Sequence, residues 1–76
     1  MTRTDVETIA EVLRQRVVKL REMFRPPDAH VPDVERFAMV QIVTLAHDIG
    51  IAFGKEDPAF DDILVETVRG EINRPR

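Results

Sequence analysis

Apolar residues recur at intervals of three and four along the first third of the chain, which is the spacing of one face of an α-helix. They are Val6, Ile9, Ala10, Leu13, Val17, Leu20 and Phe24. Thr4 and Glu7 match a capping box, in which the threonine hydroxyl accepts from a first-turn N–H and the glutamate reaches back. Pro26 and Pro27 end the pattern, because proline donates no N–H and restricts the residue before it. We therefore predict a helix over residues 5–24.

A second helix is predicted over residues 32–53, with Pro32 as a favoured first-turn residue. Its main stripe is Val34, Phe37, Ala38, Gln41, Ile42, Leu45, Ala46, Ile49 and Phe53. Apolar residues on its other sides are Met39, Val40 and Val43. The middle of this helix is therefore apolar nearly all round, which is typical of a helix buried by more than one neighbour. Either Gly50 or Gly54 can end it.

A third helix is predicted over residues 58–71. Asp57 and Pro58 supply an N-cap followed by proline at the first helical position. The stripe that follows is Phe60, Ile63, Leu64, Thr67, Val68 and Ile72. Residues 1–76 are therefore expected to form one all-α domain of three helices.

The apolar surplus of the second helix favours a symmetric dimer. A domain of 76 residues buries only about 60% of its unfolded surface and often gains support from oligomerisation. We predict a dimeric helical bundle packed through the middle of this helix, with an interface of Met39, Val40, Val43, Ala46 and Gly50. In the alternative, the first and third helices cover the surplus within a monomer.

Composition excludes several kinds of chemistry. The chain has no Cys and no Ser, so disulfides, thiolate metal sites and the usual nucleophiles are missing. There is no Gly-rich phosphate loop, so we expect no enzymatic activity and no cofactor. We find no run of about 18 apolar residues and no signal peptide at the N-terminus, and we expect a cytoplasmic protein that does not enter a membrane.

The positive charge is concentrated in one place. Residues 12–25 hold five basic residues against one acid, although the whole chain carries a net charge of −3. The partner-binding patch that we predict from this region is Arg14, Arg21, Met23, Phe24 and Arg25. The plainer alternative is a solvated face, or pairing of these bases with the acids of the third helix. A dimeric nucleic-acid binder that uses Arg14, Arg21 and Arg25 is another, although such domains are usually basic overall.

Three short motifs suggest further interpretations. Residues 44–51 are similar to the first helix and turn of a helix-turn-helix, but acids would then face the phosphates. His47-Asp48 and His30 suggest a metal site, but the chain has only two histidines and we predict none. A small helical enzyme ranks third, because residues 12–18 are similar to the first helix of helical chorismate mutases, which is much longer.

The stretch Ile49-Gly50-Ile51-Ala52-Phe53-Gly54-Lys55-Glu56-Asp57-Pro58-Ala59-Phe60-Asp61 resembles the C-terminal region of many small phage and mobile-element proteins. Those proteins run an apolar helix end into an acid, then Asp/Asn-Pro-x-Phe-Asp, then a short last helix. The resemblance covers under a third of the chain and brings no site residue with it. It implies a phage-type accessory protein that acts by binding a host or phage protein. The missing nucleophiles, the apolar surplus and the separation of basic and acidic faces favour a non-enzymatic protein-binding module that occludes or bridges a partner.

Overall fold

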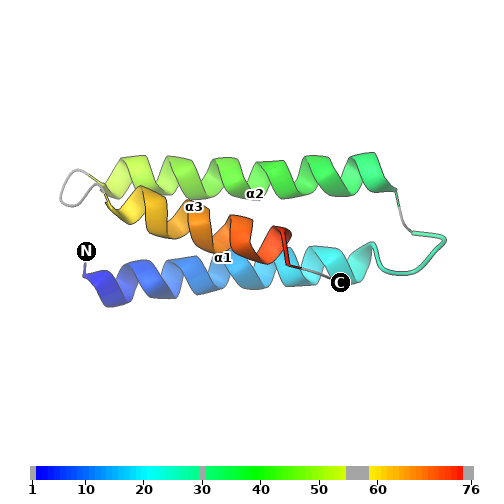
Figure 1. The fold of residues 1–76 in the computed structure, drawn as a ribbon, viewed down its shortest axis with the longest axis horizontal. Coiled ribbons are helices and arrows are strands. Elements are labelled where there is room, and N and C mark those ends of the chain that lie inside the picture. The colour runs from blue at the N-terminus through cyan, green and yellow to red at the C-terminus, as the bar shows by residue number, and fades with distance from the viewer. Residues whose placement is uncertain (1, 30, 55–58, 75–76) are drawn as a thin grey trace.

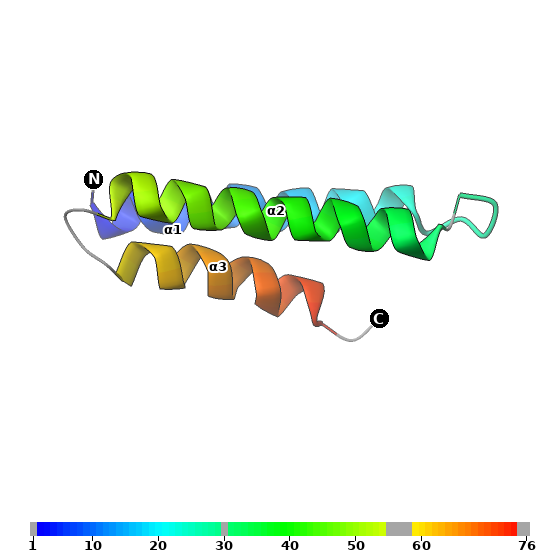
Figure 2. The same cartoon turned by 90° about the horizontal axis from the view of Figure 1, so that it is seen from above.

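The computed structural model describes residues 2–29, 31–54 and 59–74. It contains three helices, α1 (Arg3–Met23), α2 (Pro32–Phe53) and α3 (Ala59–Ile72), and no strand among the described residues. α1 and α2 run antiparallel, and α3 packs along both of them (Figures 1 and 2). The molecule measures 45 × 18 × 16 Å, and its radius of gyration is 13.3 Å, against about 11 Å for an average domain of this length. The all-α fold of three helices is confirmed, in an elongated form.

α1 begins earlier than the sequence pattern predicted. Its N-cap is Thr2, whose hydroxyl accepts from the Asp5 N–H at 3.2 Å, while the Asp5 carboxylate accepts from the Thr2 N–H at 3.0 Å. The hydrogen bond from the Thr2 backbone holds the pKa of Asp5 below its ordinary value. The predicted capping box of Thr4 and Glu7 is therefore wrong, because the chain offers the same motif two residues earlier and the helix extends to use it.

α2 has the bounds that were predicted. Its C-cap is Gly54, with a φ of −77°, so it ends without a left-handed glycine. Gly50 lies inside the helix and is buried, which excludes it as the helix end. The turn at Gly50 that the helix-turn-helix interpretation needs is therefore absent, and that interpretation is wrong.

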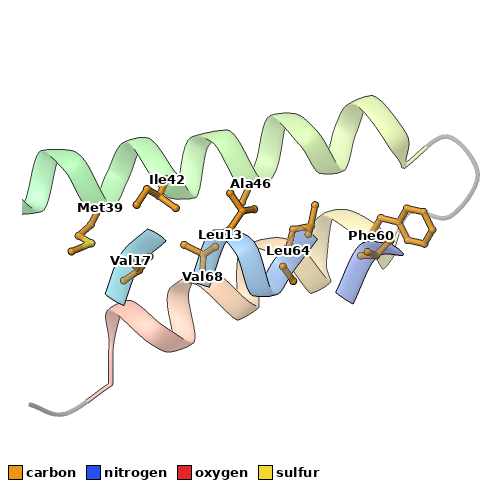
Figure 3. Close-up of a cluster of buried hydrophobic side chains, with 10 residues drawn as sticks. Leu13, Val17, Met39, Ile42, Ala46, Phe60, Leu64 and Val68 are labelled. Atoms are coloured by element: carbon orange, nitrogen blue, oxygen red, sulfur yellow. The ribbon is translucent and has the colours of Figure 1, made fainter. Parts of the chain in front are cut away.

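Ten apolar residues form the core, and all three helices contribute to it (Figure 3). They are Val6, Ala10, Leu13, Val17, Met39, Ile42, Ala46, Phe60, Leu64 and Val68. The α1 and α3 members belong to the predicted stripes. In α2, Ile42 and Ala46 belong to the predicted stripe and are buried, but Met39 is buried outside it, and the stripe members Val34, Phe37 and Leu45 are exposed. The buried face of α2 is thus rotated away from the predicted one.

Close contact between α2 and α3 explains this choice of face. A Cβ added to Gly50 would lie 2.4 Å from the Asp61 Cα and 2.8 Å from the Asp61 Cβ. No side chain fits in that space, so only the face that carries Gly50, with Ala46 one turn before it, lets α3 approach so closely. The small residues of α2, and not its largest apolar ones, therefore set the face that is buried.

α3 is much shorter than the helices it packs on. It has 14 residues, whereas α1 has 21 and α2 has 22. Its predicted N-cap, Asp57-Pro58, lies outside the described residues, and it ends at Ile72, one residue later than predicted. α3 consequently leaves the C-terminal end of α1 and the N-terminal end of α2 without a third helix (Figure 1).

Candidate interaction surfaces

A buried carboxylate gathers arginines where α1 meets the end of α3. Glu71 is 6% exposed, and one of its carboxylate oxygens accepts from Arg14 Nη1 at 2.6 Å. Arg21 Nη1 lies 3.7 Å and Arg74 Nη1 3.6 Å from the same carboxylate. Arg21 Nη2 also donates to the Ile72 carbonyl, so it serves as a side-chain cap at the C-terminus of α3. The cluster therefore fastens the last turn of α3 to α1.

Arg14 is held by a second acid. Its Nη2 and Nε donate to the two carboxylate oxygens of Glu11 at 2.7 and 2.8 Å, in a bidentate pair. The hydrogen bonds from Arg14 and then Gln15 lower the pKa of Glu11 from 4.5 to about 2. The same pair, together with Glu71, raises the pKa of Arg14 further above its ordinary value. Arg14 is thus a structural residue with two anionic partners.

The structure brings the predicted arginines together, and two of them, Arg14 and Arg21, pair with an acid of α3, as the plainer alternative expected. Arg14, Arg21 and Arg25 line a groove of about 480 Å³ between α1 and α3, together with Arg74, Glu71 and neighbours. Glu71 engages two of the three, which reduces the positive charge available for phosphate groups. Neither Met23 nor Phe24 lines this groove, although Met23 is exposed. Glu71 itself escaped the sequence analysis, but it continues the stripe of Phe60, Leu64 and Val68 at a spacing of three, and that position was the available signal.

A second groove, which we call the end groove, lies beyond the last turn of α3. Its volume is about 530 Å³. The apolar side chains that line it come from α2 and α3 and include Met39, Val43 and Ile72. Four arginines and one glutamate also line it: Arg21, Arg36, Arg69, Arg74 and Glu35. It is the space that a longer α3 would fill.

The surface of α2 that faces away from the core carries large apolar side chains. Phe37 is 66% exposed, Ile51 58% and Val40 51%. Phe37, Thr44 and Ile51 are spaced by seven residues, and Val40 falls between the first two, so the four lie along one side of the helix. The Thr44 hydroxyl donates to the Val40 carbonyl at 3.0 Å. The methyl group of Thr44 is therefore the part of this side chain that can contact another apolar surface. We call these four residues the outer stripe.

The predicted dimer interface needs correction. Met39, Ala46 and Gly50 are buried against α1 and α3 within the single chain, and Val43 is half-buried. Only Val40 of the predicted set is exposed, and it belongs to the outer stripe. The predicted interface included the small residues Ala46 and Gly50, but these residues pack against the third helix of the same chain.

The His47-Asp48 motif is divided between two environments. His47 Nδ1 lies 2.8 Å from the Asp61 Oδ1, which joins α2 to the first turn of α3, whereas Asp48 is exposed. Within the described ranges no group of three or more metal-ligating side chains comes together, and His30 lies outside them. His47 therefore acts as a contact between two helices.

Length and composition alone would let α2 cross a membrane, a criterion that the core helix of a soluble bundle also meets. Comparison with protein-family models, curated proteins and solved structures finds no match for this chain. The similarity of residues 49–61 to small phage proteins therefore stays a prediction, and any functional proposal depends on the surfaces described above.

Proposed function

We propose that this chain is a non-enzymatic protein-binding module that pairs with a second copy of itself through the outer stripe of α2. The observation that carries the proposal is the exposure of Phe37, Val40 and Ile51 on a helix whose opposite face is already in the core. Large apolar side chains grouped on a monomer's surface are typical of interaction sites. Pairing would remove them from water in both copies at once.

The spacing of the outer stripe favours an antiparallel pair of α2 helices. Phe37 and Ile51 lie seven residues on either side of Thr44. A two-fold axis beside Thr44 therefore sets Phe37 of one copy against Ile51 of the other, twice. The threonine methyl groups meet at the centre, where a small side chain allows close approach. Because the Thr44 hydroxyl already has its acceptor, burying it leaves no unpaired donor.

Cysteine cross-linking tests this geometry directly, because the chain has no cysteine of its own. In Thr44→Cys the single thiol lies on the proposed axis, where two Cα atoms can come within disulfide range. We expect mild oxidation to convert this variant into a covalent dimer. Val12→Cys is the matched control, since Val12 is 64% exposed but lies on α1. It should form no covalent dimer under the same conditions, because its thiol lies away from the proposed axis.

The native chain is examined alongside by light scattering. The subunit mass is 8.7 kDa, and the chain has no Trp or Tyr, so refractive index is the suitable concentration signal. We expect twice the subunit mass for the native chain and the single mass for Phe37→Lys. A native chain that remains monomeric at millimolar concentration, or equal cross-linking of both cysteine variants, would contradict the proposal.

A further inference from the structure

We propose that the end groove binds an acidic amphipathic helix of about two turns, supplied by a partner protein. The groove is a different surface from the centre of the outer stripe, and Val40 alone borders both. The inference depends on the shape left by the short α3 and on the charges around it. This inference is therefore independent of the proposed self-pairing of α2.

The shape of the end groove matches a helix. α3 is eight residues shorter than α2, which leaves about 12 Å of the inter-helix surface without a third helix at 1.5 Å per residue. Met39 and Val43 lie one turn apart on α2, and Ile72 closes the groove at the end of α3. Apolar side chains from one face of a two-turn helix would cover these residues, just as the apolar face of α3 covers the rest of the inner face of α2.

The charge around the end groove selects an acidic partner. Among its described lining residues are four arginines and one acid, Glu35, in a chain whose net charge is −3. Arg21 and Arg74 share the nearby Glu71, whereas Arg36 and Arg69 form no ion pair with any residue in the described part of the chain. Both of these side chains are exposed. Glutamates on the outer edges of a docked helix would pair with them and would steer its approach.

The floor of the groove favours a peptide over a nucleic acid. Single-stranded nucleic acids are held by aromatic side chains on which the bases stack. Among the residues that the structure describes, no aromatic side chain lines the end groove, and its floor consists of branched and thioether side chains. Such a floor suits leucine-like anchors at helical spacing, while the arginine rim suits carboxylates.

The test uses a synthetic helical peptide of about 14 residues, with leucines at three- and four-residue spacing and glutamates at the remaining positions. A second peptide carries lysine in place of every glutamate. Binding is measured by fluorescence anisotropy on the Phe37→Lys variant, so that self-pairing does not interfere. We expect the acidic peptide to bind and the basic one not to bind. Amide shifts in NMR spectra should concentrate at Met39, Val43 and Ile72.

Charge reversal locates the site. Arg36→Glu and Arg69→Glu should each weaken binding of the acidic peptide by about tenfold. Arg16→Glu is the matched control, because Arg16 is an exposed arginine that lines a hollow beside Val12 and Leu45, away from the end groove. It should change the affinity less than twofold. Circular dichroism confirms that each variant keeps its helices.

Three results would overturn the proposal. They are no binding at millimolar acidic peptide, equal binding of the basic peptide, and equal loss of affinity in Arg16→Glu. Binding of a 12-nucleotide single-stranded RNA that displaces the acidic peptide would also overturn it, in favour of a nucleic-acid site. None of these results bears on whether Thr44→Cys forms a covalent dimer, so failure of this proposal and failure of the self-pairing are distinguishable.

Discussion

The two faces of α2 show that side-chain size alone does not decide which residues are buried. The inner face includes Ala46 and Gly50, which are buried, and the outer face carries Phe37 and Ile51, which are 66% and 58% exposed. Burying a side chain as large as phenylalanine is worth about 1.5–3 kcal/mol. The fold forgoes that gain on the outer face because the small residues let α3 approach α2 closely along its length.

The difference shows that helix approach, and not the hydrophobicity of one residue, decides which face is inside. A large side chain at Gly50 would move α3 away from α2 and open gaps around Leu64 and Val68, both of which are almost fully buried. Gaps of that kind forfeit the dispersion contacts of every side chain along them. The large apolar residues of the outer face of α2 are then left exposed.

The largest expected effect on stability is a difference between alanine substitutions on the inner face of α2 and outside it. Ile42 is 6% exposed and Leu45 is 49% exposed, three residues apart on α2. Ile42→Ala should lower the free energy of unfolding by about 2–5 kcal/mol, because it leaves a cavity in the core. Leu45→Ala should cost about 1 kcal/mol or less. Urea unfolding of both variants measures the contrast, and equal losses would mean that both faces are buried.

A pair of glycine substitutions tests the close approach. Gly50→Ala places a methyl group on the backbone of Asp61 and should destabilise the fold by about 1–3 kcal/mol, despite the better helix propensity of alanine. Gly70→Ala meets nothing within 4 Å and should stabilise the fold by up to about 1 kcal/mol. The opposite signs are read from thermal unfolding. A stabilising Gly50→Ala would show that α3 is not in close contact there.

Periodicity alone predicted much of this fold. The stripes of α1 and α3 each have one apolar side, so their buried residues followed from the spacing. α2 is apolar nearly all round, and no spacing argument can select a face of such a helix. The missing information was the contact between Gly50 and Asp61, which depends on how α3 returns along α2.

The candidate sites were less predictable for a related reason. Arg14, Arg21 and Arg25 were correctly grouped from their spacing on one helix. Glu71, the partner of Arg14 and Arg21, is 57 and 50 residues away from them along the chain, so which acid of α3 they would meet follows only from the tertiary structure. The end groove exists because α3 is shorter than α2. No local sequence motif predicts it, because it depends on how the two helices are aligned in the fold.

Pairing through the outer face should make the stability of the chain depend on its concentration. If two copies pair through Phe37 and Ile51, the native chain should become more stable by about 1.4 kcal/mol per mole of dimer for each tenfold rise in concentration. Phe37→Lys should remove this dependence and leave a thermal midpoint that is the same at all concentrations. Circular dichroism melts from 10 µM to 1 mM measure both. A native midpoint that does not move would contradict pairing.

The smallest effect is expected for an ion pair on the exposed side of α1, where Arg14 donates two hydrogen bonds to Glu11. It contrasts a charge interaction with the packing of the inner face of α2. The pKa of Glu11 is about 2 in the folded chain against an ordinary value of 4.5. A carboxylate with a lowered pKa stabilises the fold above its unfolded value, and this contribution is lost as the pH falls from about 4.5 to about 2. Glu11→Gln should therefore melt slightly below the native chain at pH 6 and level with it near pH 2. Because the Glu11 side chain is 54% exposed, 1 M salt should shrink the difference at pH 6. A difference that persisted in salt and at low pH would show that Glu11 acts through packing, as the inner face of α2 does, and not through its charge.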